Sequence, residues 1–323
     1  MIQAQRIPAH LVESAAERLV SVPARSRRAA ARQLIESAPA HGIDLSLIWG
    51  TIDHSGTAPR VAQACLVVPT PGRTAMVYLS GPDDAQRAPD PSTQHEHRVA
   101  TLCAVFAAIE QSMTDRVALA QALVTPVEHW ALQACRDAGM LQIAELSYQK
   151  LVIPTERAAT RSLPDGVELR IAGDVAEPGA RAALARALER SYVDTRDCPD
   201  LCGLRAVDDV IDSHRATGRH NPALWWVVYL HGQPEGALLL SPFPEQSSVE
   251  LVYLGIGPVL RGRGLGRVLM EHAIEAAARA GALEMTCAVD MQNPCALRLY
   301  QRLGFRSIDR RLALVRSFRA PGF

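Results

Sequence analysis

The sequence predicts an α/β protein made of two similar domains in tandem, and three observations support this prediction. The chain has 323 residues, a length typical of two domains. Short runs rich in β-forming residues alternate with longer stretches of helical periodicity. The order of these segments in residues 1–155 recurs in residues 163–323, after a linker near 153–165 that contains Pro154 and Pro164.

The period of the apolar residues places each expected element along the chain. In the first half the elements are helices at 9–20 and 26–38, strands at 45–52, 63–69 and 74–80, a helix at 97–112, a strand at 117–123, a helix at 127–138 and a strand at 142–152. In the second half they are a strand at 167–172, helices at 178–192 and 205–217, strands at 224–231, 235–241 and 248–256, a helix at 265–280, a strand at 283–289, a helix at 294–303 and strands at 305–308 and 311–317.

Weak identity between the halves follows the same order. Residues 76–79 (MVYL) parallel residues 251–254 (LVYL), and Ala131-Leu132 parallels Ala296-Leu297. A tandem repeat explains this pattern, and chance similarity between two α/β domains of like composition is the alternative.

Composition excludes several classes of function. Basic and acidic residues number 34 each, so no net field attracts nucleic acid or an anionic membrane. No segment has the length and apolarity of a membrane span, and the start of the chain lacks a signal sequence. Seven cysteines, an odd number, fit reduced thiols in the cytoplasm. We expect no metal, because Cys198 and Cys202 have no second pair at finger-like distance.

The stretch Val249–Leu269 carries the strongest motif. An apolar run of strand type ends at Gly257-Pro258, and the glycine-rich segment Arg261–Gly266 then opens a stretch of helical spacing. Backbone N–H groups at a helix N-terminus attract anions, and glycine allows a phosphate to approach closely. The segment lacks the Gly-Lys-Ser/Thr of a P-loop, and a dinucleotide fingerprint also fits poorly. We therefore predict a diphosphate cradle.

Two motifs in order resemble the GNAT (GCN5-related N-acetyltransferase) superfamily. The first is Arg-x-x-Gly-x-Gly at Arg261–Gly266 after a strand, and the second is Asn-x-x-Ala-x-x-x-Tyr-x-x-x-Gly-Phe at Asn293–Phe305. The resemblance covers residues 167–315 and implies a GNAT fold with a mixed sheet, and acetyl-CoA as co-substrate. It implies that this co-substrate is held by Leu254, Ile256, Arg261, Gly262, Arg263, Gly264, Leu265, Gly266, Arg267 and Asn293. Asn293 is also a good helix N-cap ahead of Pro294.

In this family the strand before the loop bulges away from the next strand, and pantetheine inserts between them. The resemblance implies that Tyr300 is the acid that protonates the leaving thiolate and that Glu250 is the base, with Asp290 as the second choice. Apolar neighbours should raise the pKa of Glu250, which could alternatively bind the acceptor amine. Tyr300 could instead be a core tyrosine, and His272 fits a core histidine.

If the repeat is real, the first copy has lost this chemistry. Residues 83–97 contain no glycine and would repel a diphosphate, while Cys135 and Ala75 stand where the second copy has Tyr300 and Glu250. His95 and His97 could bind a metal, although a polar loop explains them better. We expect one competent site.

The predicted activity is that of an acyl-CoA-dependent N-acyltransferase, which moves an acetyl group from acetyl-CoA to a primary amine of a small molecule or peptide by direct attack in a ternary complex. The alternative is a non-catalytic acyl-CoA sensor or scaffold. The segment Tyr192–Gly203 is expected to wall the acceptor site, where its aspartates could bind a cationic amine or simply face solvent. A homodimer is possible, and neither nucleic acid nor membrane is an expected partner.

Overall fold

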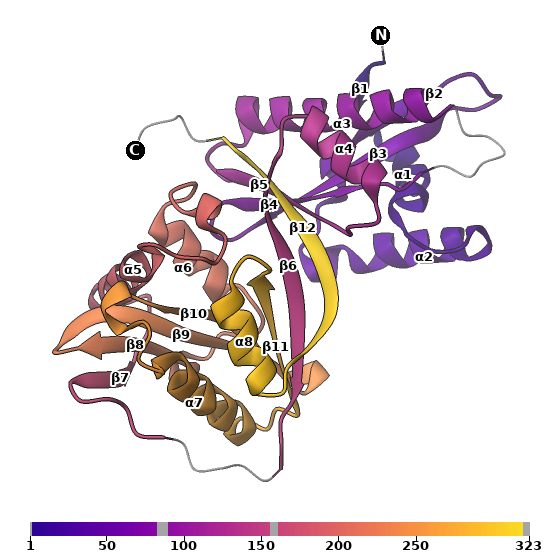
Figure 1. Cartoon of the computed structure of the whole chain (residues 1–323). Coiled ribbons are helices and arrows are strands. Elements are labelled where there is room, and N and C mark those ends of the chain that lie inside the picture. Colours follow the sequence, from indigo (N-terminus) through magenta and orange to yellow (C-terminus); the bar gives the residue numbers. More distant parts are fainter. Residues whose placement is uncertain (1, 83–89, 156–160, 319–323) are drawn as a thin grey trace. The chain divides into compact units, whose positions relative to one another are not determined.

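The computed structural model describes residues 2–82, 90–155 and 161–318. The chain forms two compact units, one of residues 1–142 with 312–323 and the other of residues 143–311. Both units have the same order of helices and strands around a mixed sheet, which confirms the predicted fold class (Figure 1). The division at 155 and 163 remains a prediction about the repeat, since the compact units take part of strand β6 and part of β12 from the opposite half of the sequence.

Unit 1 begins with a short strand and two helices. In its sheet, β1 to β5 are neighbours in chain order, and the C-terminal half of β12 pairs antiparallel with β5. Its elements are β1 (Ala4–Arg6), α1 (Val12–Leu19), α2 (Ala24–Ser37), β2 (Ile48–Asp53), β3 (Arg60–Thr70), β4 (Thr74–Leu79), α3 (Pro91–Ser112), β5 (Leu119–Val124) and α4 (His129–Asp137).

Unit 2 repeats this plan. Its sheet has the order β12-β6-β11-β10-β9-β8-β7, in which β10 and β11 are parallel and β6 is antiparallel to β11. Its elements are β6 (Leu141–Val152), β7 (Val167–Ile171), α5 (Pro178–Tyr192), α6 (Val207–Arg215), β8 (Trp225–Leu230), β9 (Gln233–Phe243), β10 (Ser248–Ile256), α7 (Leu265–Arg279), β11 (Glu284–Asp290), α8 (Pro294–Arg302) and β12 (Arg306–Ser317).

Three differences from the sequence prediction are the largest. The two strands expected at 305–308 and 311–317 are one strand, β12, because the polar run Asp309–Arg311 keeps extended backbone with exposed or half-buried side chains. Helix α3 starts at Pro91 rather than at 97, since Asp90 caps it by accepting the backbone N–H groups of Ser92 and Thr93. The three-residue strand β1 was not predicted from the sequence.

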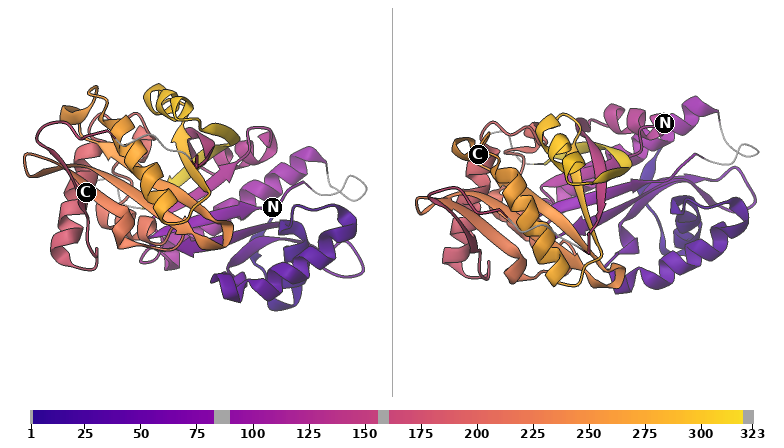
Figure 2. Two further views of the ribbon diagram at one scale, coloured as in Figure 1. Left: turned by 90° about the horizontal axis from the view of Figure 1, so that it is seen from below. Right: turned by 60° about the horizontal axis from the view of Figure 1, so that its bottom comes forward.

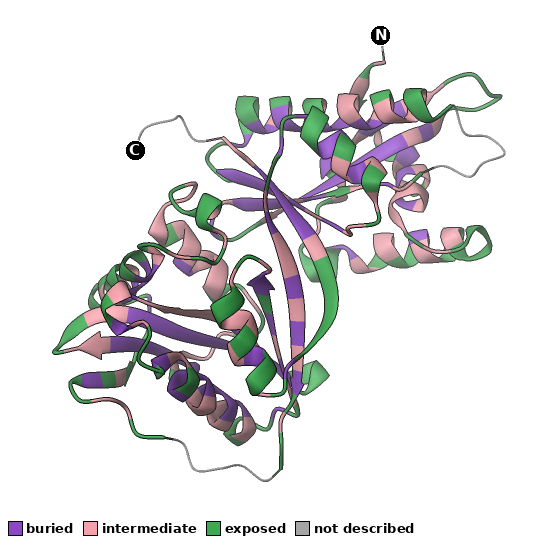
Figure 3. Ribbon diagram, viewed as in Figure 1, coloured by how far each residue is buried: buried purple, intermediate pink, exposed green. Residues whose placement is uncertain are grey.

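The sheet of unit 2 is covered on both faces. Helices α7 and α8 pack on one face, where Leu265, Leu269 and Tyr300 join Val249 and Cys287 in a core. Helices α5 and α6 pack on the other face, over β8, β9 and β10 (Figure 2). Buried residues follow the strands and the inner sides of the helices, whereas much of α8 is exposed (Figure 3). Within the described residues, no helix combines the length and apolarity that a membrane crossing requires.

Candidate active site

Strand β10 separates from β11 after its first three residues. The two strands pair only at Ser248–Glu250, opposite Glu284–Thr286. On its other edge β10 stays paired with β9 as far as Ile256, through a bulge at Val252. A bulge adds one residue and bends the strand. Past residue 250, the edge of β10 that faces β11 therefore has no β11 partner, which is the opening that the family resemblance implied.

The loop at the end of β10 leads into α7 through two glycines with left-handed backbone. Gly262 has φ +75° and Gly264, the N-cap of α7, has φ +76°. A side chain in this region would cost about 1–2 kcal/mol. Among the described residues, and apart from the chain neighbours of each glycine, no atom lies within 4 Å of where a Cβ would sit, so their surroundings are open. This open turn at a helix N-terminus fits a diphosphate held by main-chain N–H groups.

The three arginines of the segment Arg261–Arg267 have different surroundings. The Arg261 guanidinium donates three hydrogen bonds to backbone carbonyls, those of Ile256 (3.0 Å), Asp194 (2.9 Å) and Ser191 (2.9 Å). Arg267 pairs with Glu271 at 2.8 Å, one helical turn away. Arg263 is exposed. The Arg261 side chain thus joins the loop to the end of α5, and that of Arg263 faces solvent.

Of the other residues predicted to hold the co-substrate, Leu254 and Ile256 pack their side chains on the α7 face. Leu265 is buried in that core, and Gly266 lies 3.5 Å, measured from an ideal Cβ position, from the side chain of Leu299.

Asn293 caps α8, as its sequence position predicted. Its Oδ1 accepts the backbone N–H of Ala296 at 3.1 Å, and its side chain also hydrogen-bonds to Asp197. Burial raises the pKa of Asp197, and the nearby charge of Asp290 adds to this rise. Asn293 therefore connects α8 to the loop after α5.

Asp290 is buried at the end of β11, and each oxygen of its carboxylate accepts a backbone N–H group. It accepts the N–H groups of Cys198 (3.1 Å) and Gln292 (2.9 Å), while its own N–H donates to Asp197 (2.9 Å). These bonds fix the loop after α5 at a second point. They give Asp290 a structural role, so Glu250 is the better candidate for the base.

Tyr300 lies in the core between α8, α7 and β11, and only 6% of its surface is exposed. Its ring centroid lies 5.3 Å from that of Phe305. Burial raises the pKa of Tyr300 well above its usual value, with the charges of Cys287 and Asp197 adding to the rise. The phenol therefore stays protonated at neutral pH, as a proton donor must.

Glu250 is half-buried on the opposite face of β10. Burial raises the pKa of its carboxyl. The register places it between Ser241 of β9 and Thr286 of β11. The Ser241 Oγ is buried and has no hydrogen-bond partner among the described residues. The predicted acid and base thus lie on different faces of the unit 2 sheet, and Glu250 is the last β10 residue that pairs with β11 before the opening.

A cluster of polar and aromatic side chains at the end of α5 was not predicted from the sequence. The Tyr253 phenol hydrogen-bonds to the Ser191 hydroxyl (2.6 Å), and its ring contacts Tyr192 edge-on and packs against His214. The His214 Nε2 is buried without a partner among the described residues, and burial lowers the pKa of this histidine to about 4. The wide sequence separation of these residues left no local signal to detect.

In unit 1, the positions that align with Glu250 and Tyr300 of unit 2 are occupied by Ala75 and Cys135. Ala75 lies in β4 and Cys135 in α4, and both are buried. His95 and His97 lie on α3 rather than on a loop, where His95 pairs with Asp137 (2.8 Å) and His97 hydrogen-bonds to Thr51 (2.7 Å). No metal-binding group of His, Cys, Asp or Glu occurs within residues 2–82, 90–155 and 161–318. The acidic loop predicted at 83–89 lies outside the described residues.

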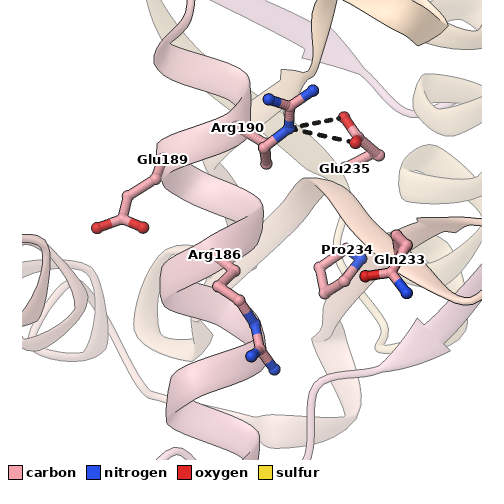
Figure 4. A pocket seen from close by; sticks show the side chains of 6 residues that line it. All are labelled: Arg186, Glu189, Arg190, Gln233, Pro234 and Glu235. Carbon is pink, nitrogen blue, oxygen red and sulfur yellow. Dashed lines mark hydrogen bonds and ion pairs between the residues drawn. The ribbon is translucent and has the colours of Figure 1, made fainter.

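A surface depression between α5 and the start of β9 contains none of the predicted site residues. It is lined by Arg186, Glu189, Arg190, Gln233, Pro234 and Glu235 (Figure 4). The ion pair between Arg190 and Glu235, at 3.2 Å, crosses it. Arg190 and Glu235 thereby neutralise each other, and we assign the depression no role in the chemistry.

Comparison with known proteins supports the geometry of unit 2. Residues 187–305 match the model of the acetyltransferase (GNAT) family. The chain is 34% identical over 91 residues to mycothiol acetyltransferase of Beutenbergia cavernae, and 38% identical over 87 residues to peptidyl-lysine N-acetyltransferase YjaB of Escherichia coli. These matches span 27% of this chain each, and 30% and 52% of the two relatives.

The likeness to one solved structure extends over nearly the whole chain. The GCN5-related N-acetyltransferase of Sphaerobacter thermophilus has a TM-score of 0.57 at 17% identity, over 98% of this chain and 96% of that one. At this identity the likeness shows the fold, which the two chains share along their length.

Proposed function

Because residues 187–305 match the model of the acetyltransferase (GNAT) family, we propose that this protein is an N-acetyltransferase that moves the acetyl group of acetyl-CoA to a primary amine. The observation that carries the proposal is the opening between β10 and β11, which leads directly to the glycine turn at the start of α7. The residues present fit coenzyme A, since the space beside Gly262 and Gly264 is open and the turn lies at the N-terminus of α7, where the first main-chain N–H groups of a helix are available to an anion.

The chain's residues have separate tasks in this proposal. The backbone of Gly262–Gly266 and the Arg263 side chain hold the diphosphate, and the free edge of β10 pairs with the pantetheine arm. Glu250 accepts a proton from the incoming ammonium, so that the neutral amine can attack the thioester carbonyl. Tyr300 donates its phenol proton to the departing sulfur, whose conjugate acid has a pKa of about 8.5. The raised pKa of Glu250 brings this base closer to neutral pH, where general bases are most effective.

The acceptor is an amine of a small molecule or a peptide, the two kinds of acceptor expected from the sequence. We expect the loop after α5 to wall the acceptor site. Arg261, which follows β10, and Asp290, at the end of β11, both hydrogen-bond to the segment 191–198 and so hold it beside the β10–β11 opening. We infer that attack occurs directly, with both substrates bound. The Cys287 thiol is a poor candidate for a covalent acyl carrier, since burial raises its pKa to about 12 and keeps it unreactive.

The test is acceptor-dependent release of CoA from acetyl-CoA, followed with a thiol reagent across a panel of amines. We expect Tyr300→Phe to lower kcat by about 100-fold or more, the usual contribution of general acid catalysis, with little change in acetyl-CoA affinity. Tyr229→Phe is the matched control, because this half-buried tyrosine lies on β8 beneath Arg170. Binding of acetyl-CoA without turnover of any amine would instead favour an acyl-CoA sensor.

A further inference from the structure

The face of the unit 2 sheet that carries Glu250 is only partly covered by helices. Among the described residues, the core beneath α5 and α6 draws strand residues from β8, β9 and β10, and none from β11 or β6. Ala288, near the end of β11, is exposed, although β11 has a strand on each side. An exposed alanine on an inner strand is the floor of an open surface rather than part of a core.

The strand register identifies the side chains around this floor. Ala288 lies opposite Tyr148 of β6, and Thr286, two residues earlier, lies beside Glu250 of β10 and opposite Lys150 of β6. Paired residues of neighbouring strands project from the same face. Glu250 and Tyr148 therefore stand on this face on either side of β11, with the small Ala288 side chain leaving the space between them open.

The polar groups on this face have unused hydrogen-bonding capacity. Within the described part of the chain, no residue hydrogen-bonds to the Glu250 carboxylate or to the Tyr148 phenol, and both residues are half-buried. Lys150 is paired with Glu284 at 2.8 Å, so its ammonium is already engaged by another carboxylate. Burial raises the pKa of Tyr148, and the charge of Glu250 adds to the rise while that of Arg311 opposes it, as expected if the phenol and the carboxylate are near each other.

We infer that Ala288 and Tyr148 form an acceptor subsite beside Glu250, and that it selects a primary amine bearing a hydroxyl or amide group close to the nitrogen. This inference rests on the proposed function. The ammonium binds at Glu250, the carbon skeleton lies over Ala288, and the hydroxyl or amide hydrogen-bonds to the Tyr148 phenol, which can both donate and accept. Tyr148 lies before the residues that match the family model, so the strand β6 adds a side chain that the matched domain lacks.

The experiment compares matched amines with and without the polar group. The first pair is glucosamine and cyclohexylamine, and the second is alaninamide and sec-butylamine. We expect Tyr148→Phe to lower kcat/KM for the polar member by up to about tenfold, the value of one hydrogen bond, and to change the apolar member less than about twofold. Ala288→Leu fills the floor and should lower kcat/KM for both members by about tenfold or more, with acetyl-CoA affinity unchanged.

Two matched variants control for general effects. Tyr229→Phe removes a phenol on β8, and Ala182→Leu enlarges an exposed alanine on α5, so both should behave as the unmodified protein. If the unmodified protein acetylates no amine, the proposed function fails and this inference fails with it. If it acetylates an amine, but Tyr148→Phe affects both members of each pair equally or neither, or Ala288→Leu acts like its control, the inference alone is overturned.

Discussion

Replacing Arg261 should weaken the fold before it weakens the chemistry. Two of its three hydrogen bonds, to the carbonyls of Ile256 and Ser191, are part-buried, and the third, to Asp194, is exposed. Bonds from a charged donor contribute about 1.5 kcal/mol or more each, and we count the exposed one as negligible. The variant Arg261→Met keeps the aliphatic stem and should therefore lower the free energy of unfolding by about 3 kcal/mol.

The assay combines urea unfolding of the full chain with hydrogen exchange of the segment Ser191–Gly203. In Arg261→Met, the backbone N–H groups of this segment should exchange faster, because its first anchor is lost. The control Arg263→Met should leave unfolding and exchange unchanged, since its side chain is exposed, and should weaken acetyl-CoA binding by about tenfold. If Arg261→Met unfolds like the unmodified protein and loses only acetyl-CoA affinity, then Arg261 binds phosphate directly and the reasoning is refuted.

Three further predictions concern the sheet and its buried groups. In Gly255→Ala the new Cβ would collide with the Tyr253 phenol, so the bond to Ser191 should break and thermal unfolding should show a loss of about 1–3 kcal/mol. Burial raises the pKa of Glu250 above its ordinary value of 4.5, and the base acts only when it is deprotonated. As the pH rises, kcat/KM should therefore increase and level off above the raised pKa of Glu250, and Glu250→Gln should abolish this limb of the pH profile. Burial lowers the pKa of His214 to about 4 in the folded state, so the unfolded chain, with a pKa of 6.5, binds this proton first as the pH falls. The free energy of unfolding should therefore decrease from pH 6.5 toward pH 4. At pH 5 urea unfolding should show a loss of about 2 kcal/mol relative to pH 7.5, and His214→Phe should not show it.

Hydrophobic periodicity was sufficient to place most elements. The bounds predicted for α5 (178–192) and β10 (248–256) are those of the structure, because apolar spacing changes sharply at Pro178 and at Gly257. The continuous strand β12 was not predictable in this way, since Asp309-Arg310-Arg311 resembles a turn in composition. A charged residue can occupy a strand wherever its side chain reaches solvent or a partner, as Arg310 does with Glu145.

Residue types at the site were predictable, but their partners were not. The sequence placed Arg261 in a phosphate-binding motif, whereas its guanidinium contacts carbonyls some 70 residues earlier in the chain. The same limit applies to Tyr148. Its strand was expected, but the neighbour of that strand, and hence the face that Tyr148 shares with Glu250, depends on sheet order rather than on local pattern.

The exchange of strand segments affects how the chain can be made and cut. Residues 312–317 complete the sheet of unit 1, although they follow the whole of unit 2 in the sequence. Unit 1 therefore cannot finish folding on the ribosome until unit 2 has been translated. A fragment starting at residue 163 would also leave β11 without β6, exposing a sheet edge that promotes aggregation. A useful fragment of unit 2 would have to start before residue 143.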